Sequence, residues 1–253
     1  MKIALLLFGQ PRNLENPNSF KSHQEWIYDE YDVDTYCHAW WEKGVESYDV
    51  SDWVNEECKA PENPIEVIEE RYKPKSIKVE PPRTFKLSDD LYKRTRDEFG
   101  TEHPWSEKTL SNVSSHLYSI ETAARLIENP NDYDFIIQSR YDNYIHNFPD
   151  LDSMSGNYFY LSDHHPRFPD LMYIFSPKFI ETQFTYGKMD ELAERHFHKF
   201  WEPSAECYKY YNYLDKFSKD QLFPIHLPVR VIRDSTGYGD TSQLPSEYLQ
   251  KLQ

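Results

Sequence analysis

The segment Tyr133–Ile145 constrains this chain most, because a strongly apolar run gives way within a few residues to charged side chains. Phe135, Ile136 and Ile137 have the apolar and β-branched character of a strand that is buried on both faces of a sheet. The polar run Ser139–Asn143 follows almost directly. A cation and a carboxylate at the end of a buried strand are costly unless they meet water, a ligand or a metal. Because ligands in open α/β sheets bind beyond the carboxyl ends of the strands, we expect this polar run to form the floor of a site.

Short apolar runs and amphipathic runs alternate along the rest of the chain. Expected strands are Lys2–Phe8, Val33–Trp41, Ser76–Val79, Tyr158–Leu161, Leu171–Phe175 and Val229–Ile232, and expected helices are Ser19–Tyr31, Pro64–Glu70, Asp89–Phe99, Lys108–Glu128, Lys178–Phe200 and Ser204–Phe217. This order predicts an α/β fold: a Rossmann-like, mainly parallel sheet flanked by helices in residues 1–145, and a more mixed α+β half in residues 146–234. We expect one domain over residues 1–253, in which 235–253 form a polar tail.

The run Lys108–Glu128 carries the clearest helical pattern in the sequence. Its apolar residues recur at alternating steps of three and four and make one stripe, composed of Leu110, Val113, Leu117, Ile120, Ala124 and Ile127. Beside this stripe lies a second ribbon of small or polar residues, composed of Asn112, His116, Ser119 and Ala123. The sequence therefore predicts a helix with one face in the core and a polar face next to it.

Composition narrows the possible partners and locations. The chain has 43 acidic and 28 basic residues, for a net charge of −15. This balance argues against nucleic acid or an anionic membrane as a partner, since both need a basic surface. There is no transmembrane run and no signal-peptide core, and the 3 cysteines show no disulfide framework. We therefore expect a cytoplasmic protein.

The turn that leaves the first expected strand contains the next candidate site, Gly9, Gln10, Pro11 and Arg12. A guanidinium at the carboxyl edge of the sheet can hold a phosphate or a carboxylate through two parallel hydrogen bonds. A proline-stiffened turn with a surface arginine is the alternative, because turns often contain such residues without a ligand.

Arg140 and Asp142 are spaced so that both side chains share one face if the strand continues. An aspartate at this place can bind Mg²⁺ or Mn²⁺ through a carboxylate oxygen, with a diphosphate supplying most of the other ligands. The alternative is an ion pair between the two side chains, which needs no ligand.

Three true Asp-x-Asp pairs occur elsewhere, and each is more typical of a solvated turn than of a metal site. Two of them precede their strands and so lie at the edge of the sheet opposite a ligand crevice, whereas the third follows the central strand and is a genuine competitor as a metal site. The pairs are, in that order, Asp32 with Asp34, Asp132 with Asp134, and Asp150 with Asp152.

Asp163 and Asp170 are candidates for a general base, because Asp170 directly precedes the apolar run Leu171–Phe175 and can point into the same crevice. A carboxylate beside an apolar wall suits general-base catalysis, and a surface-loop aspartate is the alternative. His196 and His198 are spaced to fall on different faces of a helix, and no His-Glu-x-x-His motif is present. A zinc enzyme is therefore not expected.

Trp40 and Trp41 end the second expected strand, close to His38. Indole rings near the carboxyl edge of the sheet can stack on a nucleobase or a sugar ring. Packing in the core is the alternative and the more common situation for such residues.

Taken in order, these segments resemble a group of proteins from bacteria, phages and large viruses that look like nucleotide-sugar glycosyltransferases of the GT-A fold, in the neighbourhood of lipopolysaccharide and capsule enzymes. The matching segments are Ile3–Phe8 with Gly9–Asn13, Asp34–Trp41, Ser119 and Ile120 with Ala123, and Tyr133–Asp142. The resemblance covers about the first 145 residues and, more faintly, Asp170–Pro177. It implies a sugar nucleotide bound beyond the strand ends and transfer of the sugar to a hydroxyl group of a glycan acceptor.

The resemblance also implies roles for single residues. Gly9–Arg12, His38, Ser119 and Arg140 would contact the donor, and Asp142 would stand where the family's Asp-x-Asp metal motif ends. Arg140 replaces the first acid of that motif, and a guanidinium can itself neutralise a departing diphosphate. If the reaction inverts the sugar, Asp170 or Asp163 would take the proton of the acceptor.

Two other functions compete with the transferase. A non-catalytic nucleotide- or carbohydrate-binding protein on the same fold is favoured by the incomplete Asp-x-Asp motif. A metal-dependent phosphoesterase is disfavoured, because the sequence lacks a set of histidine and aspartate ligands.

Overall fold

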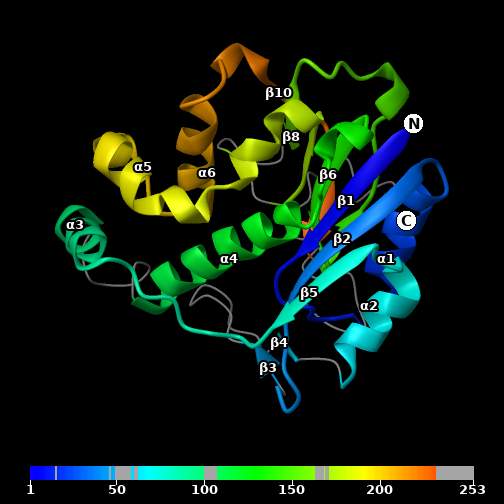
Figure 1. The fold of residues 1–253 in the computed structure, drawn as a ribbon, viewed down its shortest axis with the longest axis horizontal. Coiled ribbons are helices and arrows are strands. Elements are labelled where there is room, and N and C mark those ends of the chain that lie inside the picture. The colour runs from blue at the N-terminus through cyan, green and yellow to red at the C-terminus, as the bar shows by residue number, and fades with distance from the viewer. Residues whose placement is uncertain are drawn as a thin grey trace, which may run out of the picture.

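The computed structural model describes residues 1–14, 16–45, 47–48, 58–59, 62–99, 107–162, 168 and 171–231, and it has an α/β fold. Among these residues, seven strands form one main sheet with helices on both faces (Figure 1). The strands of this sheet are β1 (Lys2–Phe8), β2 (Asp32–Trp40), β5 (Ser76–Glu80), β6 (Phe135–Arg140), β8 (Phe159–Ser162), β9 (Tyr173–Phe175) and β10 (Leu222–Ile225). The helices are α1 (Pro17–His23), α2 (Pro64–Tyr72), α3 (Asp89–Phe99), α4 (Glu107–Arg125), α5 (Met189–His196) and α6 (Ala205–Leu214).

The main sheet is mainly parallel, as the sequence predicts. Its strand order is β10-β8-β9-β6-β1-β2-β5. β1 runs parallel to both β2 and β6, β2 runs parallel to β5, and β10 runs parallel to β8. Only β9 runs antiparallel to its neighbours, β6 and β8, within the described sheet. The mixed pairing therefore belongs to the C-terminal half, where it is expected.

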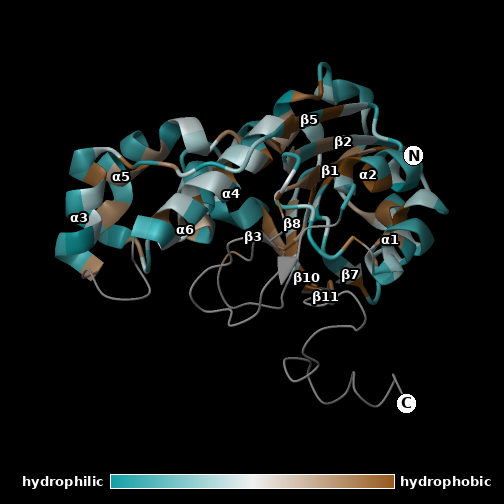
Figure 2. Cartoon of the chain, turned by 90° about the horizontal axis from the view of Figure 1, so that it is seen from below, coloured by the Kyte–Doolittle hydropathy of each residue, from teal (hydrophilic) through white to brown (hydrophobic). Residues whose placement is uncertain are grey.

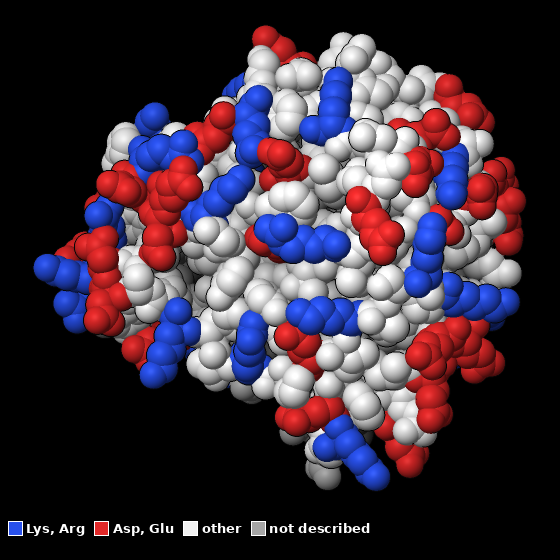
Figure 3. Space-filling view, viewed as in Figure 1, with Lys and Arg blue, Asp and Glu red and all other residues white. Residues whose placement is uncertain are grey.

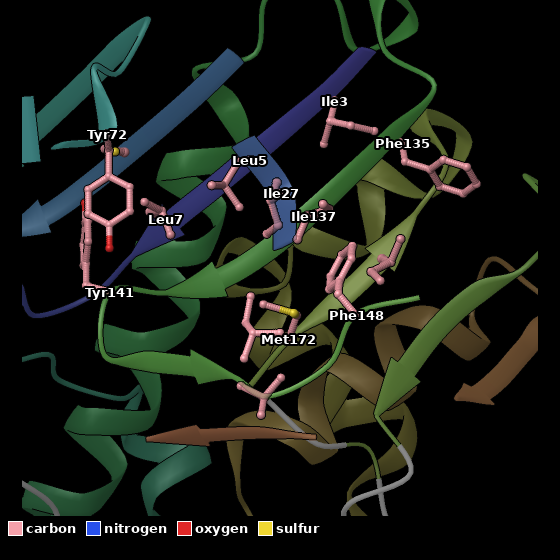
Figure 4. Packing of buried hydrophobic residues seen from close by; sticks show 14 of the residues in the cluster. Ile3, Leu5, Leu7, Ile27, Tyr72, Phe135, Ile137, Tyr141, Phe148 and Met172 are labelled. Carbon is pink, nitrogen blue, oxygen red and sulfur yellow. The ribbon is translucent and has the colours of Figure 1, made fainter. Parts of the chain in front are cut away.

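Both faces of the sheet are buried, because its central strands alternate side chains between two hydrophobic clusters. On β1, Leu5 and Leu7 point into one cluster, whereas Ala4 and Leu6 point into the other. Figure 4 shows the first cluster, which contains Leu5 and Leu7 of β1, Ile137 of β6 and Tyr72 of α2, with Tyr72 beside Tyr141. This two-sided burial explains why these strands are apolar runs without polar alternation.

Helix α4 covers the other face of the sheet and packs against β1 and β2. Its apolar stripe is buried at Leu110, Leu117, Ile120 and Ala124, as the spacing predicts. Helices α3, α5 and α6 share a further cluster beyond α4, and Figure 2 shows them as a group on one side of the sheet.

The helical predictions need two corrections. The run Lys178–Phe200, predicted as one helix, is a 3₁₀ segment at Pro177–Gln183, a 3₁₀ turn at Tyr186–Lys188, the helix α5 and a last 3₁₀ turn. The run Ser19–Tyr31 divides into α1 and a π-helical segment, Gln24–Tyr28. In both places tertiary packing selects short, differently wound pieces over a continuous α-helix.

Two short antiparallel pairs lie outside the main sheet. One joins β3 (Ser47–Tyr48) to β4 (Cys58–Lys59), and the other joins β7 (Asn143–Ile145) to β11 (Val229–Val231). The expected last strand thus pairs with β7. An edge of the main sheet is formed by β10, a strand that the sequence pattern does not predict. The predicted tail, 235–253, lies outside the described residues.

Charge is interspersed on the surface. Figure 3 shows Lys and Arg side chains mixed with Asp and Glu side chains over the visible face. In the described part of the chain, no helix is both long and apolar enough to cross a membrane.

Candidate functional site

The topology of the sheet marks one edge as the place for a ligand. β1 lies between β2 and β6, and all three strands run parallel. The chain passes from β1 to β2 on one side and later returns to β6 on the other side. A crevice at such a switch point, beyond the carboxyl ends of the strands, is where ligands bind in open α/β sheets. Gly9 begins the turn that leaves β1. Its φ of 103° is a backbone conformation that residues with a side chain rarely adopt. The turn Gly9–Arg12 is therefore located where the sequence predicts a site.

Arg12, Arg140 and Asp142 meet at this edge and form what we call the Arg–Asp cluster. Arg12 Nε donates to Asp142 Oδ2 at 2.7 Å. Arg140 Nε donates to Asp142 Oδ1 at 2.8 Å, and Arg140 Nη2 donates to Oδ2 at 2.8 Å. The structure thus joins residues that are 130 positions apart in the sequence.

Electrostatics make the Arg–Asp cluster cationic. Burial of Asp142 raises its pKa, but the charges and hydrogen bonds of Arg140 and Arg12 outweigh burial and hold the pKa well below its usual range. The carboxylate is therefore ionised at neutral pH. Two guanidiniums and one carboxylate leave a net charge of +1 beside a protein whose overall charge is −15.

The cluster borders two hollows that adjoin each other. The small hollow has a volume of about 160 Å³ and is lined by Phe8, Gly9, Gln10, Arg12, Trp40, Asn112, Ser115, His116, Arg140 and Asp142. The large hollow has a volume of about 1090 Å³ and extends over the segment after β5 and the start of α4. Both hollows share the lining residues Gln10, Trp40, Asn112 and Ser115. The structure thus places Gly9, Gln10, Arg12, Arg140 and Asp142 around one space.

The donor atoms at Asp142 do not suit a divalent cation. Both carboxylate oxygens already accept hydrogen bonds from guanidiniums, and two positive charges would repel Mg²⁺ or Mn²⁺. In the ranges that the structure describes, no group of three or more His, Cys, Asp or Glu side chains is arranged to hold a metal ion. The metal ion expected on Asp142 stays a prediction, and the residues present fit an anion better.

His38 and Ser119, which the resemblance places against the donor, lie beneath the site. Both are fully buried and neither lines a hollow. Ser119 Oγ accepts the Gly9 N–H at 2.8 Å and lies 2.5 Å from His38 Nδ1. Pro11 is also buried and does not line either hollow. Because these side chains lie behind the turn, they support it rather than face a ligand.

Trp40 serves the core and the site together. Its side chain is buried, it stacks on Tyr118 at 5.4 Å between ring centroids, and it lines both hollows. Arg83 lies over the same aromatic group, 4.4 Å from the Tyr118 centroid. Trp40 therefore packs in the core, as one of the two interpretations expects, and it also borders both hollows, whereas stacking on a ring of a ligand stays a prediction.

The competing aspartates lie elsewhere. Asp34 binds Lys75 and Tyr133 at the amino-terminal edge of the sheet. Asp150 accepts a hydrogen bond from the backbone N–H of Asp152 in an exposed turn, as expected for a solvated pair. The proposed bases Asp163 and Asp170 lie outside the described residues.

Asn112, Ser115 and His116 line the small hollow and are absent from the predicted site. Two of them belong to the polar ribbon that the spacing of α4 identifies beside its apolar stripe. That ribbon was the available signal, because a polar face next to a buried stripe must meet either water or a site.

Comparisons with known proteins add little at the level of sequence. No family model matches the chain, and no curated protein matches it. Among solved structures, it is similar to the glycosyltransferase GlyE of Streptococcus pneumoniae TIGR4, with TM-score 0.40 and 9% identity over 88% of this chain and 44% of that chain. The apo form of GlyE gives TM-score 0.41 and 8% identity over 89% of this chain and 44% of that chain. The chain thus spans less than half the length of these GlyE chains.

Proposed function

We propose that this protein is a glycosyltransferase that moves a sugar from a nucleoside-diphosphate donor to a hydroxyl group of a glycan acceptor. The observation that carries the proposal is the Arg–Asp cluster, a cationic group that borders a hollow at the switch point of a mainly parallel sheet. The resemblance of the first 145 residues to nucleotide-sugar glycosyltransferases supports the same conclusion.

The diphosphate of the donor would lie in the small hollow. Arginine donates through a planar fork of N–H groups that matches phosphate oxygens, and both Arg12 and Arg140 line the small hollow. As the bond to the sugar breaks, negative charge grows on the departing diphosphate, and the nearby guanidiniums would stabilise it. Asp142 holds the two guanidiniums together, since their mutual repulsion would otherwise separate them.

The large hollow would hold the rest of the donor. It joins the small hollow through Trp40 and Gln10, and it combines an aromatic surface with hydrogen-bonding side chains of both charges. Pockets of this kind suit ligands that have both a ring face and polar edges, as nucleosides and sugars do. Asp163 or Asp170 would take the proton of the acceptor in an inverting reaction.

A non-catalytic nucleotide- or carbohydrate-binding protein is the second candidate. Asp142 is the one carboxylate among the described residues that line the small hollow, and both of its oxygens are occupied by arginines. Such a carboxylate is a poor base. The hollow would then bind a ligand without transforming it.

Two measurements separate these functions. Thermal shifts with UDP, GDP and CMP, each with and without Mn²⁺, should show stabilisation by one nucleotide, because a ligand held at about 100 times its Kd adds about 2.7 kcal/mol. No shift with any of them would refute both the transferase and the nucleotide-binding alternative. Hydrolysis of the matching sugar nucleotide, lost in Asp170→Asn or Asp163→Asn while nucleotide binding persists, would identify the enzyme. Binding without any turnover would favour the binding protein.

A further inference from the structure

A chain of hydrogen bonds runs from the edge of the sheet to the turn that carries Arg12. Glu80 Oε2 lies 3.2 Å from His38 Nε2, and His38 Nδ1 lies 2.5 Å from Ser119 Oγ. Ser119 Oγ accepts the N–H of Gly9 at 2.8 Å. The four residues come from β5, β2, α4 and the turn after β1, so the chain links three elements of the fold to the site.

We propose that Glu80, His38 and Ser119 are positioning residues, a relay that fixes the backbone of Gly9 and thereby sets Arg12 for an anionic ligand. This inference rests on the proposed function, because it concerns the phosphate-binding side of the same site. It differs from the role that the sequence resemblance gives His38 and Ser119, since neither would touch the donor.

The direction of each hydrogen bond follows from Glu80. Three other contacts, two from Tyr118 OH and one from Lys78 Nζ, favour the charged form of this carboxylate, and its pKa lies below its usual value although burial raises it. An ionised carboxylate can only accept, so His38 Nε2 carries the hydrogen. His38 Nδ1 must then accept from the Ser119 hydroxyl, which leaves Ser119 Oγ free to accept from Gly9.

Histidine in this relay is neutral at neutral pH. Burial lowers the pKa of His38 to about 4, and the hydrogen bond and charge of Glu80 only partly oppose burial. Lys78 and Arg83 also face His38 and lower its pKa further. A neutral ring with one donor and one acceptor matches the serine and the carboxylate on its two sides.

The relay contains the residue types of a serine hydrolase triad, but it cannot act as one. In a triad, the acid binds Nδ1 and the serine faces Nε2, whereas here the two nitrogens have exchanged partners. Ser119 is fully buried and does not line either hollow, so no substrate reaches its hydroxyl group. Orientation of the turn is the function that remains for this hydrogen bond.

Gly9 is the residue through which the relay acts. Its N–H binds Ser119, and its C=O accepts from the Trp40 N–H at 3.0 Å. With both backbone groups of Gly9 hydrogen-bonded, the turn is held in one orientation. This orientation sets the positions of Gln10 and Arg12. A displacement of about 1 Å in an active site can lower the reaction rate about 100-fold. The fixed orientation of the turn therefore has a direct effect on the site.

The test measures binding of inorganic pyrophosphate by calorimetry to the full chain. Ser119→Ala leaves the Gly9 N–H without its acceptor, and we expect the Kd for pyrophosphate to rise about tenfold. Ser119→Thr retains the hydroxyl group and should restore much of the affinity. Ser114→Ala is the matched control, because Ser114 is a buried serine of the same helix whose hydroxyl group binds Leu110 O instead, and its Kd should stay within about twofold of the wild type.

A second measurement needs no variant. In the wild type at pH 7, nitrogen NMR should find His38 as the neutral tautomer with hydrogen on Nε2, and the Gly9 amide should exchange slowly. The opposite tautomer, an imidazolium, or an unprotected Gly9 amide would overturn the relay. So would a folded Ser119→Ala that binds pyrophosphate as the wild type does. Failure of the wild type to bind pyrophosphate would instead overturn the phosphate site of the proposed function. It would also overturn the proposal that the relay sets Arg12 for an anionic ligand.

Discussion

Replacing Asp142 by Asn should be one of the most damaging single isosteric changes in this protein. The carboxylate accepts three hydrogen bonds of 2.7–2.8 Å from Arg12 and Arg140, and its side chain is 2% exposed. Removal of one partner from a buried ion pair costs about 3–5 kcal/mol, because it leaves the other charge buried without compensation. For a chain of this size, Tm changes by about 2–4 °C per kcal/mol, so we expect Tm to fall by about 6–20 °C.

The same change has a defined pH dependence. The pKa of Asp142 in the folded protein lies below its unfolded value, so its stabilising effect is complete above an unfolded pKa of about 3.9 and is lost as pH falls toward the folded pKa. The difference in stability between the wild type and Asp142→Asn should therefore shrink below about pH 4. Calorimetric unfolding across pH measures both effects. Asp152→Asn, at an exposed turn, is the control, and its stability should change by less than about 0.5 kcal/mol. A folded Asp142→Asn as stable as that control would refute the buried-pair argument.

Three further changes test the site, the core and the opposite edge of the sheet. Arg12→Met should weaken pyrophosphate binding by about tenfold or more while Asp142 keeps Arg140 as a partner, which calorimetry can measure. Leu5→Ala should lower the free energy of unfolding by about 2–5 kcal/mol in a denaturant titration, because Leu5 is fully buried in the core of the central strand. Asp34→Asn should cost less than about 1 kcal/mol at pH 7, since this carboxylate is partly exposed. Hydrogen bonds from Lys75 and Tyr133 outweigh burial and lower the pKa of Asp34 to about 2, so that cost should vanish as pH falls to about 2.

The sequence predicts the central strands well because burial on both faces leaves an unmistakable pattern. Lys2–Phe8 is observed with the predicted limits. The edge strand Ser76–Glu80 is only partly buried, and it too exceeds its prediction by only one residue. The helix α4 is likewise identified by its stripe, which has a single period over 19 residues. These elements form where local pattern and tertiary packing agree.

Predictions fail where packing, rather than local pattern, determines the winding. In Pro177–Lys188 the chain forms 3₁₀ turns, one of which contains Gly187, although its apolar residues recur at helical spacing. Prediction of the site from sequence fails for the same reason. The sequence places Arg12 and Arg140 at one edge of the sheet, but the contact between Arg12 and Asp142 joins the turns after β1 and β6 and has no local signature. Likewise, only the register of α4 on β1 decides that Ser119 meets Gly9 while His116 lines the small hollow.

The substitution of Arg140 for the first acid of an Asp-x-Asp motif has a testable consequence for metal use. With Arg140 the cluster carries a charge of +1, and with Arg140→Asp it would carry −1, from one guanidinium and two carboxylates. Two carboxylates and a diphosphate are hard oxygen ligands that suit Mn²⁺, whereas two guanidiniums bind the diphosphate without it.

We therefore expect wild-type pyrophosphate binding to be nearly independent of Mn²⁺, and binding to Arg140→Asp to need it. Arg140→Met is the control, since it removes the cation without adding an acid and should weaken binding with or without Mn²⁺. Calorimetry with and without EDTA measures the difference. Wild-type binding that EDTA abolishes would show that the guanidiniums do not replace the metal ion, because charge neutralisation by arginine alone would then be insufficient to hold a diphosphate at this edge of the sheet.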